Sequence, residues 1–240
     1  MAPSRGVSLA WVTGGTRLWE ATLAALEDPA LAAPSALPGW SRSHVVAHVA
    51  LNAEALLNLL TWARTGVETP MYASPEARDA DIEELAASDA QLVRARSERA
   101  ASELDDAFAA LGEQDWEARV RVRQGTEIPA SVVPWLRVRE VYLHALDLDG
   151  AATDEDLPRD VASALVEDAS RQRSRDETHP SLVLREQAGD ACWEIGRPGP
   201  DAPVVVGDVR ALAAWVTGRP TTSPPSRTDG QALPELPAWL

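Results

Sequence analysis

Four long segments in the first 150 residues carry apolar side chains at the spacing of an α-helix. Such spacing predicts helices that each bury one face. Long amphipathic helices that follow one another in a chain pack as a bundle, and bundles hold metal ions on side chains that point inward. We therefore predict a four-helix bundle over residues 1–150, with helices at 5–27, 41–64, 74–112 and 129–148 and a short hairpin at 117–128.

Polar and glycine residues mark where these helices begin, end or weaken. Ser41 or Ser43 is a natural N-cap for the second helix, and Gly66 is suited to end it. Ser88-Asp89 allows a break within the third segment. Gly14-Gly15 weakens the middle of the first helix and allows a bend or a frayed start.

The composition changes after residue 150. Short runs of strand-forming residues are separated there by glycine and proline clusters, and two amphipathic stretches flank them. We predict a small α+β domain over residues 151–240. Its expected elements are a helix at 158–173, strands at 182–184, 191–195 and 203–206, and a helix that Asp208 caps and that ends at Thr217.

Charge and cysteine content exclude several classes of function. The net charge of −15 argues against a nucleic-acid binder, which needs a basic face. Every basic residue is arginine, so a substrate carboxylate would meet a bidentate guanidinium. The single cysteine, Cys192, excludes an internal disulfide and is expected to be a small buried residue. No membrane-spanning apolar run or leader segment is expected, which favours a cytoplasmic protein. The oligomeric state stays open, and a monomer is compatible with the sequence.

Glu140 and His144 lie four residues apart in the fourth predicted helix. This spacing places both side chains on one face, with Cβ atoms roughly 6 Å apart. A carboxylate and an imidazole so placed can hold one divalent metal ion from adjacent turns. The alternative is an ordinary Glu–His pair on the helix surface.

A third ligand must come from another helix, and His48 is the best candidate. His44 and His48 are also four residues apart. Val45 and Val49 flank His48 and place it beside the core, whereas His44 lies near the helix N-terminus and is expected to be half exposed.

Several blocks of the sequence resemble one family. The blocks at 37–50, 68–78 and 139–148, together with the terminal Pro-Ala-Trp-Leu at 237–240, closely resemble the mycothiol-dependent maleylpyruvate isomerases. These enzymes belong to the DinB-like superfamily of metal-binding bundles and have an added C-terminal α+β domain. The resemblance spans nearly the whole chain but is weak at 80–115 and 150–205.

The resemblance implies a zinc ion held by His48, Glu140 and His144 with one position open. It thereby selects His48 over His44. It further implies that Arg78 and Arg219 are functional arginines near the site, where they would clamp carboxylates of the substrate or of the thiol cofactor, or an enolate.

The reaction that the resemblance implies converts maleylpyruvate to its trans isomer, fumarylpyruvate. Addition of a thiol to the alkene makes the bond single, rotation follows, and elimination restores the alkene. The implied nucleophile is mycothiol rather than Cys192. Zinc could deprotonate the thiol or polarise a substrate carbonyl, and the sequence leaves both open.

Two other functions are compatible with the same residues. One is a mycothiol S-transferase that acts on another electrophile, which would share the metal and the thiol. The other is a non-catalytic binding module in which zinc is structural. Structural zinc sites are closed by a fourth protein ligand, and Asp147, near His144, is the candidate for that role.

Overall fold

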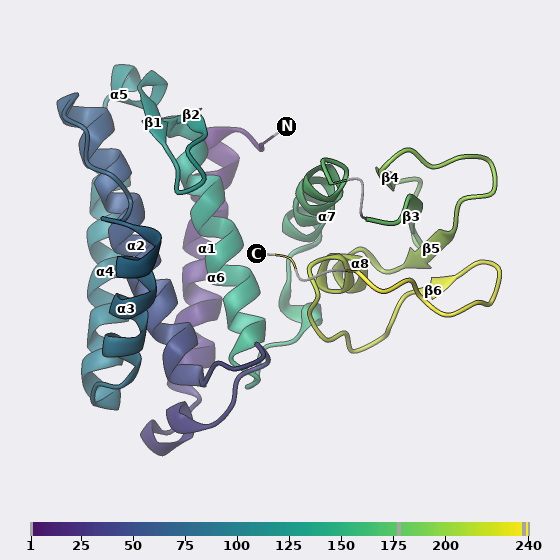
Figure 1. The fold of residues 1–240 in the computed structure, drawn as a ribbon, viewed down its shortest axis with the longest axis horizontal. Coiled ribbons are helices and arrows are strands. Elements are labelled where there is room, and N and C mark those ends of the chain that lie inside the picture. The colour runs from purple at the N-terminus through teal and green to yellow at the C-terminus, as the bar shows by residue number, and fades with distance from the viewer. Residues whose placement is uncertain (1, 177–178, 237–238, 240) are drawn as a thin grey trace. The chain divides into compact units, whose positions relative to one another are not determined.

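The computed structural model describes residues 2–176, 179–236 and 239. Contacts divide the chain into two compact units, Pro3–Ala151 and Ala152–Leu240. The first is a helical bundle and the second a small α+β unit (Figure 1). The predicted fold class is therefore confirmed.

The bundle consists of four long helices, and each buries an apolar stripe. Helix α1 packs against α6, while α2 packs against α4 and α6. A shorter helix, α3, covers part of α2. The bounds are α1 Arg5–Ala24, α2 Arg42–Thr65, α3 Pro75–Ala86, α4 Ala90–Ala110 and α6 Val133–Asp147, with the short helices η1 Asp28–Ala32, α5 Glu113–Glu117 and η2 Ala130–Val132 between them.

The predicted ends of α2 are confirmed. The Ser41 side chain accepts a hydrogen bond from the backbone of His44, and Gly66 ends the helix with a φ of 72°. That left-handed conformation is one that glycine adopts without steric cost. The third predicted segment does break at Ser88-Asp89, because Asp89 caps a new helix, α4.

Gly14-Gly15 does not interrupt α1, which runs unbroken through both residues. The glycines serve packing instead. A Cβ atom at Gly15 would lie 2.5 Å from Val141 and 2.7 Å from Tyr142, which is closer than side chains tolerate. The absence of a side chain therefore lets α1 approach α6 closely.

The hairpin before α6 forms as predicted. Strands β1 (Arg119–Arg121) and β2 (Glu127–Pro129) pair antiparallel, with Val120 opposite Ile128. The short helix α5 was not predicted; Gly112 is its N-cap, and it buries Trp116. Helices this short carry no periodic signal.

Helix α2 is both long and apolar. The expectation that the chain lacks an apolar run of membrane-spanning length is wrong for α2, which is long and apolar enough by composition alone. Most of that window is buried within the bundle, as in the core helix of a soluble protein. Its burial on several faces explains the unusual composition.

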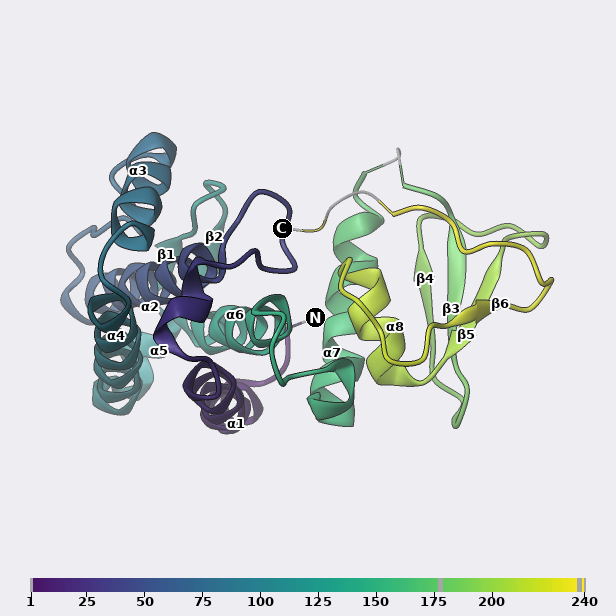
Figure 2. The ribbon, with the colours of Figure 1, turned by 90° about the horizontal axis from the view of Figure 1, so that it is seen from below.

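The second unit stacks two helices on one face of a four-stranded sheet (Figure 2). The strand order is β4-β3-β5-β6, with β3 and β5 parallel and the other pairs antiparallel. Strand β6 was not predicted. The bounds are η3 Asp154–Asp156, α7 Arg159–Arg173, β3 Leu182–Glu186, β4 Cys192–Ile195, β5 Val204–Gly207, α8 Val209–Val216 and β6 Ser226–Arg227.

Cys192 is exposed, so its predicted burial is wrong. Side chains alternate across a strand, and in β4 it is Trp193 and Ile195 that point into the core. Of the terminal Pro-Ala-Trp-Leu block, only Trp239 lies among the described residues.

Candidate metal centre

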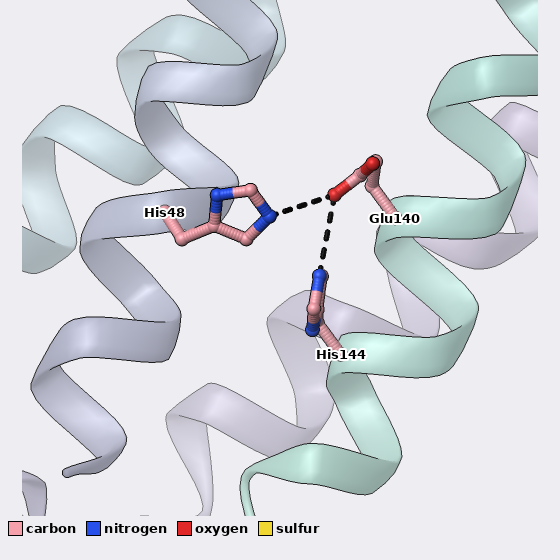
Figure 3. Close-up of side chains that lie close together, drawn as sticks. All are labelled: His48, Glu140 and His144. Atoms are coloured by element: carbon pink, nitrogen blue, oxygen red, sulfur yellow. Dashed lines mark hydrogen bonds and ion pairs between the residues drawn. The ribbon is translucent and has the colours of Figure 1, made fainter. Parts of the chain in front are cut away.

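Three side chains from two helices meet inside the bundle. His48 comes from α2, and Glu140 and His144 come from successive turns of α6. Both imidazoles direct Nε2 at the same carboxylate oxygen, Oε2 of Glu140 (Figure 3). The Nε2–Oε2 distances are 3.0 Å for His48 and 3.2 Å for His144. The structure thus brings the three predicted ligands together.

The two histidine–carboxylate distances match those of a tetrahedral metal site, and all three ligand atoms lie within 4.8 Å of one another. Ligands about 2.0–2.1 Å from a zinc ion lie roughly 3.3 Å apart when the angles are tetrahedral. Within the part of the chain that the structure describes, His48, Glu140 and His144 are the only acidic, histidine or cysteine side chains grouped closely enough to hold an ion. Three protein ligands leave one position open, as in catalytic zinc sites.

The histidines control the charge of Glu140. Burial by itself would raise the pKa of this carboxyl, but hydrogen bonds from His144 and His48 outweigh burial and hold the pKa well below its ordinary value. Glu140 is therefore a carboxylate, which is the form that binds metal.

Asp147 contacts His144 through Nδ1, the ring nitrogen that does not face Glu140. This nitrogen lies 2.8 Å from Oδ2 of Asp147, a carboxylate that is 1% exposed. Burial lowers the pKa of His144, but the bonds to Asp147 and Glu140 outweigh it and raise the pKa overall. Because Nδ1–H donates to Asp147, Nε2 is the nitrogen available to a metal. Asp147 therefore orients His144 and does not act as a fourth ligand.

His48 has a different partner behind it. Nη2 of Arg78, from α3, lies 3.2 Å from its Nδ1. A guanidinium can only donate, so in this arrangement Nδ1 accepts and Nε2–H donates to Glu140. Burial lowers the pKa of His48, and although Glu140 opposes this, the charges of His144 and Arg78 lower it further. A neutral imidazole that binds metal through Nε2 carries its hydrogen on Nδ1, so the Arg78 contact and the metal exclude each other.

His44 does not join the group. It completes a capping box with Ser41 at the start of α2. Its Nε2 lies 3.2 Å from a carboxylate oxygen of Glu83, which is largely exposed. As expected, His44 is partly exposed and His48 is buried.

Two further residues beside the centre were missed by sequence reasoning. The guanidinium of Arg78 lies over the ring of Tyr72, 5.8 Å from its centroid. Arg137 is 1% exposed and donates to the carbonyl oxygen of Val49 and to Asn52. Burial lowers the pKa of Arg137 to about 10, and the charge of Glu140 opposes that shift. An arginine inside an apolar helical stretch, three residues before a metal ligand, was the available signal.

Arg219 belongs to the second unit, just after the end of α8. It is 7% exposed, and its Nη1 donates to the carbonyl oxygen of Thr217 at 2.6 Å and to that of Trp239. These contacts lie within its own unit. Its predicted role at the active site stays a prediction.

Comparison with known proteins identifies the family. The family model for the mycothiol maleylpyruvate isomerase N-terminal domain matches residues 12–149. The chain belongs to this family. The crystal structure of a mycothiol-dependent maleylpyruvate isomerase is 33% identical, covers 99% of this chain and 98% of its own, and superposes with a TM-score of 0.92. The structure of a histidine-to-alanine mutant of a mycothiol-dependent maleylpyruvate isomerase gives the same values. A search of curated proteins gave no match.

Membership of the mycothiol maleylpyruvate isomerase family confirms the resemblance inferred from the sequence. The matched region contains His48, Glu140 and His144 and the orienting Asp147. The similarity to solved isomerases extends over both units, because the alignment covers nearly the whole chain.

Proposed function

We propose that the chain is a mycothiol-dependent isomerase that converts maleylpyruvate to fumarylpyruvate. One observation carries the proposal: two histidines and a carboxylate converge on a single point in a chain of this family. The proposal implies a soluble enzyme that acts on small molecules in the cytoplasm and contacts neither nucleic acid nor membrane.

The donor set suits zinc. Two imidazole nitrogens and one carboxylate oxygen are ligands that Zn²⁺ accepts readily. Asp147 fixes the tautomer of His144 that such an ion requires. When bound, zinc supplies Lewis acidity that lowers the pKa of a thiol or polarises a carbonyl, and mycothiol supplies a thiol for reversible addition to the alkene.

The residues around the centre favour anions. Glu140 is the negative charge among the three ligands, and Asp147 adds a second behind His144. Arg78, which also pairs with Asp79, and Arg137 place guanidinium groups close to the centre. A divalent ion makes the centre net positive, which stabilises a thiolate and a substrate dianion. Arg78 is released from His48 when the histidine binds metal, and its planar guanidinium then pairs with a carboxylate.

Arg219 is proposed to bind a carboxylate of the substrate or of the thiol. Arg219→Ala should keep its zinc and its fold while kcat/KM falls roughly tenfold to a hundredfold, the effect of losing one charge-assisted hydrogen bond. Lysine should substitute poorly, because a bidentate contact is required. A variant that melts several degrees lower but turns over normally would instead make Arg219 a cap of α8.

The decisive test is an ultraviolet assay of maleylpyruvate isomerisation with purified protein. We expect turnover that requires added mycothiol, is lost after chelation and returns with Zn²⁺. His44→Ala serves as the control and should stay active, while His48→Ala should not. Zinc-loaded protein that leaves maleylpyruvate unchanged but conjugates mycothiol to another electrophile would contradict the isomerase and favour the S-transferase.

A further inference from the structure

A groove of about 240 Å³ opens in the bundle beside Tyr72, whose ring lies under the guanidinium of Arg78. It runs between the segment that connects α2 to α3 and the β1–β2 hairpin. Its lining combines aromatic, apolar and charged side chains. The residues that line it are Trp62, Glu68, Pro70, Met71, Tyr72, Ala73, Ser74, Pro75, Arg121, Val122, Arg123 and Gly125.

One end of the groove is connected to the metal centre through two side chains, Tyr72 and Arg78. Tyr72 contributes its ring to the groove and also lies beneath Arg78, which contacts His48. Burial and the charge of Glu140 raise the pKa of the Tyr72 hydroxyl, and Arg78 and Arg123 oppose this rise. The charges of Glu140 and of Arg123 on the hairpin therefore both act on the Tyr72 hydroxyl.

The other end lies far from the centre. Trp62 follows His48 by fourteen residues on the same helix. At 1.5 Å per residue, the two positions are about 21 Å apart along α2. A ligand whose reactive end is at the metal must be long to occupy the whole groove.

The outer end provides an aromatic surface with donors and acceptors beside it. The guanidinium of Arg121 lies 6.0 Å from the ring centroid of Trp62 and pairs with Glu68 at 3.1 Å. Arg123 is exposed, and in the described part of the chain it has no hydrogen bond or ion pair. Aromatic faces beside charged hydrogen-bonding groups suit a ring that carries many hydroxyl groups.

We propose that this groove binds the sugar portion of mycothiol and so positions its sulfur at the metal centre. The inference rests on the proposed function. Mycothiol joins a cysteine to two polyhydroxylated rings and is a longer molecule than maleylpyruvate. In addition, Glu68 at the outer end is unfavourable for a substrate carboxylate and favourable as an acceptor for hydroxyl groups.

The test measures mycothiol binding to zinc-loaded protein by calorimetry, which does not require turnover. Arg123→Ala should raise the Kd for mycothiol roughly fivefold to tenfold, since donor contacts to the hydroxyl groups are lost. Arg119→Ala is the matched control: it lies on the same hairpin, is exposed, and does not line the groove. It should leave the Kd unchanged.

A thiol without sugars distinguishes the contribution of the groove to binding from that of the metal. Binding of N-acetylcysteine, measured in the same way or by competition with mycothiol, should be equal in wild type, Arg123→Ala and Trp62→Ala. The inference would be overturned if the two variants lost equal affinity for both thiols, or if they lost no affinity for mycothiol. A higher KM for maleylpyruvate in Arg123→Ala, with unchanged affinity for mycothiol, would also overturn it, because the groove would then hold the substrate. If the wild-type protein is inactive but binds mycothiol, and Arg123→Ala weakens that binding, the proposed function is contradicted and the groove assignment is not.

Discussion

His44 and His48 are one helical turn apart on α2 and have opposite surroundings. The side chain of His44 completes a capping box and meets an exposed carboxylate, Glu83. His48 lies in the buried interior and meets Glu140, whose other neighbour is a second histidine. The difference teaches that an i,i+4 histidine pair need not be a metal pair. The decisive factor is which residue of the pair faces a ligand on another helix.

The largest expected effect separates the two histidines directly. His48→Ala should lower zinc affinity by well over about a hundredfold, because one of three direct ligands is lost, which exceeds the cost of removing an outer partner. Competition with a chromophoric chelator measures this affinity. His44→Ala is the control and should bind zinc with wild-type affinity. A variant His48→Ala that retains full zinc content would contradict the assignment.

The next contrast concerns the partner of Nδ1. His144 has the carboxylate of Asp147 there, whereas His48 has the guanidinium of Arg78. Asp147→Asn should reduce zinc affinity about tenfold, at the lower end of the 10–100-fold range for outer partners, because an amide still accepts from Nδ1–H but lacks the charge. The same chelator competition applies. If Asp147→Asn instead binds zinc as wild type does, the carboxylate serves packing only.

Arg78, which contacts Nδ1 of His48, should lower zinc affinity, whereas Asp147 should raise it. Arg78→Met removes a donor that competes with the tautomer needed for metal binding, so zinc affinity should rise about threefold to tenfold. Turnover should fall in the same variant, because the anion-binding guanidinium is gone. Weaker zinc binding in Arg78→Met would mean that the arginine supports the loaded site and is not displaced from it.

The smallest effect concerns stability at the start of α2. His44→Ala removes one half of the capping box, and we expect a loss of roughly 0.5–1 kcal/mol in the free energy of unfolding. Urea denaturation of the chelated protein measures it. A loss of several kcal/mol would show that His44 supports more than a helix end.

Local patterns predicted the bundle and the Glu140–His144 pair because their signals lie within single helices, whereas the family resemblance selected His48 over His44. The spacing of Glu140 and His144, the cap at Ser41 and the stop at Gly66 each follow from one or two turns of chain. Glycine at a close helix contact gives the same local signal as a bend, so the packing role of Gly15 was not predicted. Strand alternation did not reveal which face of β4 is buried, so the exposure of Cys192 was also missed.

The surroundings of the ligands were beyond such patterns. Tyr72 lies in a loop and meets the centre only because α3 folds back along α2. Arg137 makes its hydrogen bonds to a different helix. Contacts between segments this far apart in the chain depend on the packed structure, not on spacing. The family resemblance supplied Arg78 for the same reason.

The metal centre also depends on Gly15, where α1 and α6 approach each other closely. Val141 and Tyr142, which a side chain at this position would displace, directly follow Glu140 on α6. A bulkier residue on α1 would shift the turn that carries two of the three ligands, although α1 contributes no ligand itself. In a survey of mutational tolerance, Gly15 should therefore rank with the two histidines, because a side chain there would press on the turn of α6 that follows Glu140.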